Sequence, residues 1–359
     1  MQKGILETYR AFLPIEESTP MVSMGEGNTP LVKSVQLGKM LGCEELYFKL
    51  EGCNPTGSFK DRGMAMAVAK ALESGSKAIM CASTGNTSAS AAAYGGRFSI
   101  STVVVVPKGR IAAGKVTQAM AHSARIIMVD GSFDQALSLV RNFTDQHPIT
   151  LVNSINPYRL EGQKTGAFEI VDDLGDSPDY LFIPTGNAGN ITAYWKGFKE
   201  YHQAEMSRSL PKMMGFQAQG AAPIVLGHPV EDPKTVASAI RIGNPANWTA
   251  ALSARDDSGG VIDKVSDDEI LEAYELLASC EGIFCEPASA ASFAGLRKLH
   301  AEGLDVSCRR VVCIITGTGL KDPDTAVERF IPEITEIGAD PKDLEAALQS
   351  ISEGGEGIG

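Results

Sequence analysis

One lysine stands where its amine could act as a covalent catalyst. Lys60 lies near the end of the turn-forming segment Asn54–Arg62, whose sequence is NPTGSFKDR. After it, apolar residues recur at helical spacing from Met64 to Leu72, and Gly75 stands where such a helix would end. The positive end of a helix dipole disfavours an ammonium ion, so the neutral amine of Lys60 becomes more accessible. A Schiff-base lysine needs that bias, although a lysine beside an aspartate is most often a solvated surface residue.

A polar turn, Ser83–Ser88, follows the apolar run Ala78–Ala82 and precedes a helix of small residues, Ala89–Tyr94. Backbone N–H groups and hydroxyls at a helix N-terminus suit a carboxylate or a phosphate. An ordinary capping turn rich in serine and threonine explains the same residues equally well.

A glycine-containing turn, Thr185–Asn190, follows the strand-like run Tyr180–Pro184 and opens another helix. Gly186 and Gly189 let the backbone approach an anion, and the helix N-terminus supplies N–H donors. The turn matches neither the dinucleotide glycine pattern nor the Walker loop, since no lysine follows Gly189. A phosphate is the predicted occupant.

Thr316 follows the apolar run Arg309–Ile315. A hydroxyl at the carboxyl end of a strand faces the crevice where open parallel sheets bind ligands, although a turn-forming threonine is equally compatible with this position. One site is indicated by four features in this order along the chain: Lys60, the polar turn that contains Asn86, the glycine turn and Thr316.

With these motifs the chain resembles the fold-type II pyridoxal-phosphate enzymes, and among them most closely the threonine synthase family. The lysine, asparagine and glycine motifs are shared across fold-type II enzymes, including dehydratases. The phosphate-reading turn and the segment Ser238–Pro245 point more narrowly to threonine synthases. The resemblance extends from about Gly25 to about Asp322 and rests on Gly25–Leu31, Pro55–Arg62, Ser83–Thr87, Gly186–Asn190 and Ser238–Pro245.

The resemblance implies pyridoxal 5'-phosphate as the cofactor. Lys60 would hold it covalently and move protons, and Phe59 would lie alongside its ring. Asn86 would bind the 3'-oxygen, and Thr316 would face the pyridine nitrogen without enforcing its protonation. The cofactor phosphate would rest on Gly186, Asn187, Ala188, Gly189 and Asn190.

The implied reaction converts O-phospho-L-homoserine and water into L-threonine and phosphate by γ-elimination and β-hydration. Arg159 would be the main charge on the substrate phosphate, because a guanidinium binds phosphate in a bidentate manner. A surface residue at a helix start is the alternative for Arg159. The substrate carboxylate would bind Thr84, Asn86 and Thr87, and the substrate phosphate Ser83, Asn153, Ser154, Arg159 and Asn187.

Two other functions compete with this one. A pyridoxal-phosphate threonine or serine dehydratase shares the core motifs, and the segment Glu286–Ser289 is similar to one found in dehydratases, although a proline at a helix start also explains it. Arg159 discriminates, since a dehydratase has no substrate phosphate to neutralise. A non-catalytic binding protein with the same fold would need no covalent lysine at position 60.

Strand-like runs alternate with helical patterns along the chain, which predicts an α/β fold of two doubly wound domains with mainly parallel sheets. The resemblance to fold-type II enzymes implies an architecture similar to that of tryptophan synthase β. We expect an N-terminal domain over residues 1–155, a C-terminal domain over 156–345 and a disordered tail over 346–359. Strand-like runs are Ala78–Ala82, Thr102–Val106, Arg125–Asp130, Ile149–Val152, Tyr180–Ile183, Met213–Gln217 and Arg309–Ile315; helical patterns are Phe133–Thr144, Arg159–Asp173, Asp267–Cys280 and Ser289–His300.

Composition agrees with an enzyme that acts on a small molecule. The 359 residues suffice for two domains, and a net charge of −12 argues against nucleic acid or an anionic membrane as a partner. The seven cysteines show neither CxxC nor zinc spacing, so no metal is expected. No apolar run approaches the length of a membrane span. We therefore expect a cytoplasmic protein, and a homodimer by resemblance to the family.

Overall fold

The computed structural model describes residues 3–108, 113–131, 133–330 and 334–353. The chain divides into two compact units, Met1–Asp322 and Pro323–Gly359. The second unit contains two helices, α14 (Pro323–Arg329) and α15 (Pro341–Glu353). Residues 346–353 of the expected tail thus belong to α15, which begins with proline at its first position and with Asp340 accepting the Lys342 N–H at 2.9 Å. Residues 354–359 lie outside the described part.

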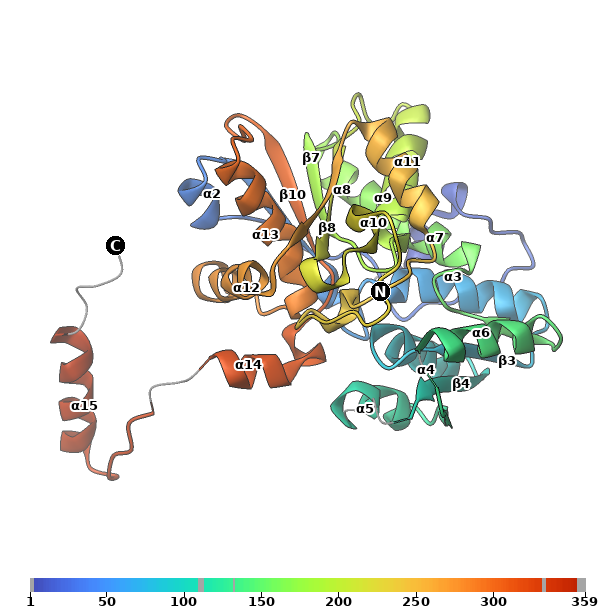
Figure 1. The fold of residues 1–359 in the computed structure, drawn as a ribbon, viewed down its shortest axis with the longest axis horizontal. Coiled ribbons are helices and arrows are strands. Elements are labelled where there is room, and N and C mark those ends of the chain that lie inside the picture. Colours follow the sequence, from blue (N-terminus) through green and yellow to red (C-terminus); the bar gives the residue numbers. More distant parts are fainter. Residues whose placement is uncertain (1–2, 109–112, 132, 331–333, 354–359) are drawn as a thin grey trace. The chain divides into compact units, whose positions relative to one another are not determined.

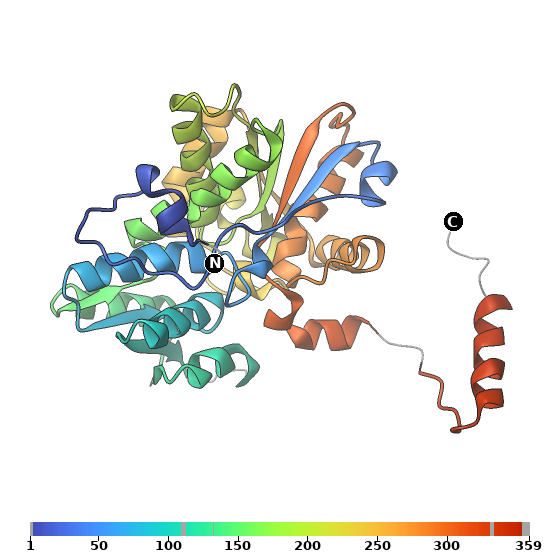
Figure 2. The same ribbon diagram turned by 180° about the vertical axis from the view of Figure 1, so that it is seen from behind.

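The larger sheet of the first unit brings strands from both ends of the sequence together. Strand β10 lies between β2 and β7 and runs parallel to both, whereas the edge strand β1 is antiparallel to β2. In Figure 2 the blue β2 runs beside the orange β10, although more than half of the chain separates them. The order is β1 (Leu31–Lys33), β2 (Glu45–Leu50), β10 (Arg310–Ile315), β7 (Tyr180–Pro184), β8 (Lys212–Ala218) and β9 (Val261–Val265).

The smaller sheet comes from one stretch of the chain and is parallel throughout. Its order is β5 (Arg125–Val129), β4 (Ser101–Pro107), β3 (Ala78–Ala82) and β6 (Ile149–Leu151). All five residues of β3 are buried, as expected for a parallel strand that is covered on both faces. The α/β fold with mainly parallel sheets is therefore confirmed.

Helices cover both sheets (Figure 1). Helix α3 packs against α4 and α7, and α13 packs against strands of the larger sheet. The helices of the first unit are α1 (Ile5–Thr8), α2 (Leu37–Met40), α3 (Lys60–Glu73), α4 (Asn86–Arg97), α5 (Ala113–Ala121), α6 (Phe133–Thr144), α7 (Pro157–Gln163), α8 (Thr165–Leu174), α9 (Gly189–Gln203), α10 (Pro223–Leu226), α11 (Trp248–Ser258), α12 (Asp267–Glu281) and α13 (Pro287–Ala301).

Several elements differ from the sequence-based expectation. The expected helix Arg159–Asp173 is two helices, α7 and α8, which meet at Lys164. Strands β1, β2 and β9 were not expected, and β2 joins the larger sheet because Leu46 and Phe48 bury their side chains there. The larger sheet therefore contains strands from both sides of residue 155. The expected domain boundary between residues 155 and 156 stays a prediction.

A buried ion cluster ties the N-terminal segment to this framework. The Arg62 guanidinium, fully buried, lies between Glu51 at 2.7 Å and Glu169 at 2.6 Å. Glu169 also contacts Lys49 at 2.9 Å and accepts the Asn28 backbone N–H at 2.7 Å. Burial alone would raise the pKa of Glu169, but Arg62 and Lys49 hold it at about 2. The segment Gly25–Leu31 is thereby fixed against α3 and α8.

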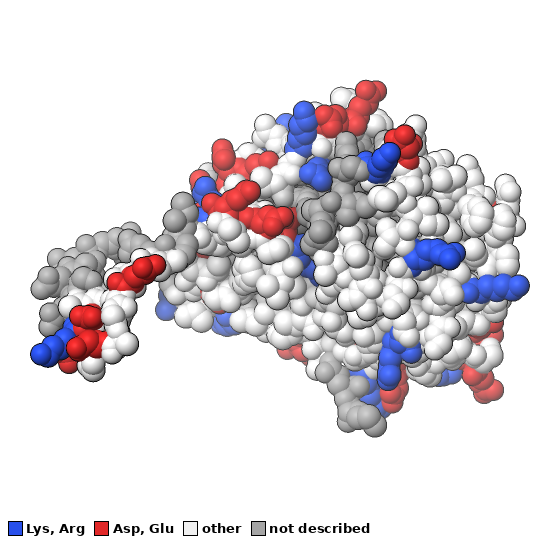
Figure 3. Space-filling view, turned by 90° about the horizontal axis from the view of Figure 1, so that it is seen from below, with Lys and Arg blue, Asp and Glu red and all other residues white. Residues whose placement is uncertain are grey.

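On the face seen in Figure 3, basic and acidic side chains are interspersed rather than gathered by sign. Within the described ranges, no helix has both the length and the apolar character that a membrane crossing requires.

Candidate active site

A cavity of about 960 Å³ lies where three parallel strands end. The turn after β3, the loop after β7 and Thr316 after β10 all line it, as expected for ligand sites at the carboxyl ends of parallel strands. The structure therefore brings together most of the predicted site residues: Phe59, Lys60, Ser83, Thr84, Asn86, Thr87, Asn153, Ser154, Gly186, Asn187, Ala188, Gly189, Asn190 and Thr316.

Lys60 is the first residue of α3 and faces this cavity. Its Nζ lies 4.2 Å from the centroid of the Phe59 ring. Burial, and then the nearby charge of Arg159, lower the pKa of Lys60 to about 7, while Glu286 opposes that shift. Docking of α3 on the larger sheet fixes this position, because the Phe59 N–H donates to the Thr316 carbonyl oxygen at 3.0 Å. With this pKa a large fraction of the amine is neutral at physiological pH, and the neutral form is the one that a Schiff-base lysine requires.

Glu286 joins two of the predicted cofactor contacts. The Asn86 amide donates to both of its carboxylate oxygens, at 3.3 and 3.0 Å. The Thr316 hydroxyl donates to Oε1 at 3.0 Å and lies 2.8 Å from the Ser289 hydroxyl. Burial raises the pKa of Glu286, whereas the bonds from Asn86 and Thr316 and the charge of Lys60 lower it. This carboxylate therefore sets the orientation of both neighbouring side chains.

The loop before α9 is built to receive an anion. Ala188 precedes the helix at φ 62°, and no side chain caps the helix N-terminus. Those backbone N–H groups are therefore available to a ligand. Gly186 has to be glycine, because an added Cβ would lie 2.8 Å from the Ile240 Cα. The Asn190 Nδ2 is buried and has no hydrogen-bond partner within the described part of the chain.

The turn after β3 presents a second helix N-terminus, that of α4, to the same cavity. The Ser83 hydroxyl accepts the Gly85 N–H at 3.2 Å and the Ser88 N–H at 3.3 Å. Its own O–H can therefore donate to a ligand. Two anion-binding helix starts thus face one lysine, which fits a cofactor phosphate and a substrate carboxylate.

Asn153 and Asn187 are engaged in holding the walls of the cavity. Asn153 exchanges two hydrogen bonds of 2.9 Å with the backbone of Ala82 at the end of β3. Asn187 donates to the Ser154 hydroxyl at 2.5 Å and accepts the Ala246 N–H at 2.7 Å. The Ser154 hydroxyl oxygen accepts this bond, so the Ser154 O–H can still donate to a ligand.

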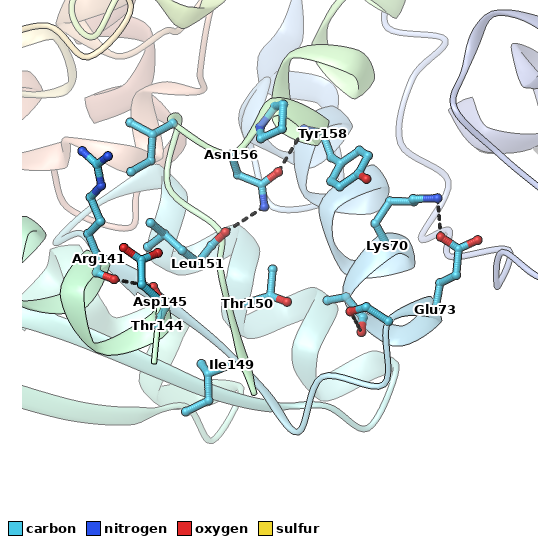
Figure 4. A pocket seen from close by; sticks show the side chains of 14 residues that line it. Lys70, Glu73, Arg141, Thr144, Asp145, Ile149, Thr150, Leu151, Asn156 and Tyr158 are labelled. Carbon is cyan, nitrogen blue, oxygen red and sulfur yellow. Dashed lines mark hydrogen bonds and ion pairs between the residues drawn. The ribbon is translucent and has the colours of Figure 1, made fainter. Parts of the chain in front are cut away.

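A second hollow, of about 700 Å³, borders the same connection from β6 to α7 (Figure 4). Within it, the Asn156 side chain caps α7 by accepting the Tyr158 N–H at 2.9 Å and donating to the Leu151 carbonyl oxygen at 2.7 Å. This cap explains why the connection that carries Asn153 and Ser154 holds its shape.

Arg159 does not line the cavity. It is fully buried on α7, and its Nη1 donates to the Val152 carbonyl oxygen at 2.7 Å. Its Nε has no partner within the described ranges. The positive charge of Arg159 nevertheless lowers the pKa of Lys60, so Arg159 lies close to the lysine without lining the cavity. The alternative of a surface residue is wrong.

Six charged residues that line the cavity were not among the site residues predicted from the sequence: Glu231, Asp232, Lys234, Arg241, Glu286 and Lys321. Glu286 was considered only as a sign of a dehydratase. Lys321 donates to Gln118 Oε1, and burial lowers its pKa. No spacing in the sequence places Lys321 near Lys60. Arg241 could have been noticed, since it lies inside the recognised segment Ser238–Pro245. The described residues contain no cluster of three metal-ligating side chains.

Comparison with known proteins identifies the family. The family described as "Pyridoxal-phosphate dependent enzyme" matches residues 22–317. The threonine synthase of Halalkalibacterium halodurans is 56% identical over 352 residues, which are 98% of each chain. The chain belongs to the threonine synthase family. Within it, the Mycobacterium tuberculosis member is 54% identical over 94% of each chain, and the Methanocaldococcus jannaschii member is 51% identical over 96% of this chain and 87% of that one. The fold-type II resemblance is thereby confirmed.

Solved structures agree on the fold. Maize serine racemase has a TM-score of 0.72 at 19% identity and covers 98% of this chain and 99% of its own. A threonine deaminase from Solanum lycopersicum has a TM-score of 0.68 at 21% identity, with 91% of this chain and 84% of its own covered. Pyridoxal phosphate is the cofactor of the family, and the cavity described above fits it: a lysine with a lowered pKa, an uncapped helix N-terminus and the glycine at position 186 are all present.

Proposed function

We propose that this protein is a threonine synthase, which converts O-phospho-L-homoserine and water into L-threonine and phosphate. The observation that carries the proposal is the 51–56% identity, over nearly the whole chain, to proteins named threonine synthase. The site is compatible with that reaction, because its one lysine with a pKa near 7 faces two helix N-termini that can hold separate anions.

Lys60 is proposed to bind the cofactor and to move protons on the substrate carbons. When bound, the cofactor withdraws electrons from those carbons, which makes their protons removable. A lysine with a pKa of about 7 can both accept and return a proton at neutral pH. Phe59, Asn86 and Thr316 are proposed to contact the cofactor ring, and residues Gly186 to Asn190 its phosphate.

The substrate is proposed to bind between the β3 turn and the β6–α7 connection. Thr84, Asn86 and Thr87 would take the carboxylate at the α4 N-terminus, and Ser83 and Ser154 would donate hydroxyls to the phosphate. Asn153 and Asn187 are also proposed to bind the substrate phosphate. Arg159 is proposed to bind it too, and its guanidinium would have to turn from the Val152 carbonyl oxygen to reach the phosphate.

The deciding experiment supplies the purified protein with O-phospho-L-homoserine and measures L-threonine and phosphate. Serine and threonine are tested in parallel, with 2-oxo acids and ammonia as the products measured. We expect equal amounts of threonine and phosphate from the first substrate. Formation of 2-oxo acids from free hydroxyamino acids, without phosphate release from the first substrate, would establish the dehydratase instead.

We also propose that the protein is a cytoplasmic homodimer. The resemblance to the threonine synthase family supports the homodimer. Each chain has a mass of 38.0 kDa. Light scattering on the purified protein distinguishes a dimer from a monomer or a larger assembly. The two-domain division near residue 155 is proposed with it, and limited proteolysis at that connection tests it.

A further inference from the structure

The segment Ser238–Gly243 forms one wall of the active-site cavity. It lies directly against the loop assigned to the cofactor phosphate, since the Ile240 Cα would stand 2.8 Å from a Cβ on Gly186. The segment belongs to the motif Ser238–Pro245 that is typical of threonine synthases, yet none of its residues has a role in the function proposed above.

Hydrogen bonds hold this wall in place from both ends. At its start, the Ser238 hydroxyl donates to Asp322 Oδ2 at 2.6 Å. Beyond its end, the Ala246 N–H donates to Asn187 Oδ1 at 2.7 Å, and the Asn247 side chain donates to the Ser154 and Asn187 carbonyl oxygens at 3.4 and 3.3 Å. The wall is therefore tied to Ser154 and Asn187, two residues proposed to bind the substrate phosphate.

Arg241 is the cationic residue of this wall. Arg241 lines the cavity and is exposed, and its guanidinium forms no hydrogen bond or ion pair with the described residues, whereas its backbone N–H donates to the Ser238 carbonyl oxygen at 3.3 Å. The other cations around the cavity are engaged: Lys234 pairs with Asp232 at 3.2 Å, and Lys321 donates to Gln118. Lys60 is the lysine assigned to the cofactor.

The cofactor phosphate has an uncapped helix N-terminus to bind, but a second phosphate in the same cavity needs a further positive charge. Arg159 supplies such a charge only after it turns from the Val152 carbonyl oxygen, because its side chain is buried and bonded there. An exposed guanidinium without a partner can bind a phosphate in a bidentate manner, and no protein bond has to break.

We propose that Arg241 binds the phosphate group of the substrate, and that it determines the preference for a phosphorylated over an unphosphorylated amino acid. The inference rests on the proposed function and adds a residue to its substrate site. The Ser154 hydroxyl would be the neutral partner of Arg241, since both residues line the cavity and Asn187 bonds both to Ser154 and to the Ala246 N–H beyond the end of the wall.

The test measures binding by calorimetry on the cofactor-loaded enzyme. One probe is the phosphonate isostere of the substrate, in which CH₂ replaces the ester oxygen, and the other is norvaline, which lacks the phosphonate. We expect Arg241→Ala to weaken phosphonate binding about 10- to 100-fold, the range for a lost charged hydrogen bond, and to leave norvaline binding within about twofold. Arg241→Lys keeps the charge without the bidentate geometry and should fall between the two.

Lys234→Ala is the matched control, because it removes an exposed cation of the same cavity that is already paired. It should change binding of either probe by less than about twofold. Equal weakening of both probes by Arg241→Ala, or a change below about threefold for the phosphonate, would overturn the inference. The visible spectrum of the bound cofactor should be the same in all variants.

Failure of this inference can be told apart from failure of the proposed function. A wild-type enzyme that makes threonine from O-phospho-L-homoserine, together with an Arg241→Ala variant of unchanged kcat/KM, refutes the role of Arg241 alone. A wild-type enzyme that makes no threonine refutes the function itself.

Discussion

The buried amine of Lys60 is expected to destabilise the cofactor-free protein at neutral pH. In the unfolded chain this lysine has a pKa near 10.5, whereas in the folded protein burial lowers the pKa to about 7. Between these values the unfolded chain holds a proton that the folded protein does not. Stability therefore rises with pH across that window, by at most about 1.4 kcal/mol per pH unit from this group. Replacing Lys60 by methionine should remove the rise.

The expected size follows from the two pKa values. Between pH 7 and pH 9 the contribution of Lys60 to the free energy of unfolding changes by about 2 kcal/mol. This figure is an upper bound, because Lys60 borders a cavity that admits water and is not fully excluded from solvent. At pH 7 the Lys60→Met variant should be more stable than the wild type, and its advantage should shrink by up to that amount at pH 9.

The assay is urea unfolding of the cofactor-free protein at both pH values, followed by tryptophan fluorescence. Comparing wild type with variant at each pH cancels the other titrating groups. Lys77→Met, at an exposed lysine, is the matched control for loss of one charge. An advantage of Lys60→Met that stays constant, or grows, from pH 7 to pH 9 would refute a lowered pKa at this lysine.

Three further outcomes are expected. Glu169→Gln should lower the free energy of unfolding by about 3–5 kcal/mol in urea titration, since Arg62 loses a buried partner. The stability that Glu169 supplies is present above pH 4.5 and is lost as pH falls through its pKa of about 2. The unfolding free energies of wild type and variant should therefore converge in acid. Thr316→Asp should favour a protonated cofactor ring and change the visible spectrum, whereas Thr316→Ala should leave the cofactor bound; unchanged spectra in both would move Thr316 away from the ring. Arg159→Ala should lower kcat/KM for O-phospho-L-homoserine by roughly 30- to 5,000-fold relative to that for serine and should also raise the pKa of Lys60, whose value Arg159 depresses; an unchanged ratio of the two kcat/KM values would count against a phosphate role.

Local patterns predicted the parts of the fold that depend on near neighbours. The apolar runs at Ala78–Ala82 and Tyr180–Ile183 are strands because they are buried on both faces, and burial leaves a direct trace in composition. Strand β1 left little trace: it is three residues long and two of them are exposed. Its position depends on pairing with β2, which in turn depends on β10 more than 250 residues away. Pairing partners at that separation are decided by the whole fold.

The sequence by itself determined the chemistry of the site. Lys60, the polar turn at Ser83–Thr87, the glycine turn at Gly186–Asn190 and Thr316 were recognisable because each depends on local backbone and helix-end properties. The tertiary structure alone decided which charges surround them. It placed Glu286 between Asn86 and Thr316, buried Arg159 behind Lys60, and left Arg241 exposed at the cavity wall. Those outcomes depend on distances between segments far apart in the chain, because desolvation and Coulomb interactions act through space and not along the sequence.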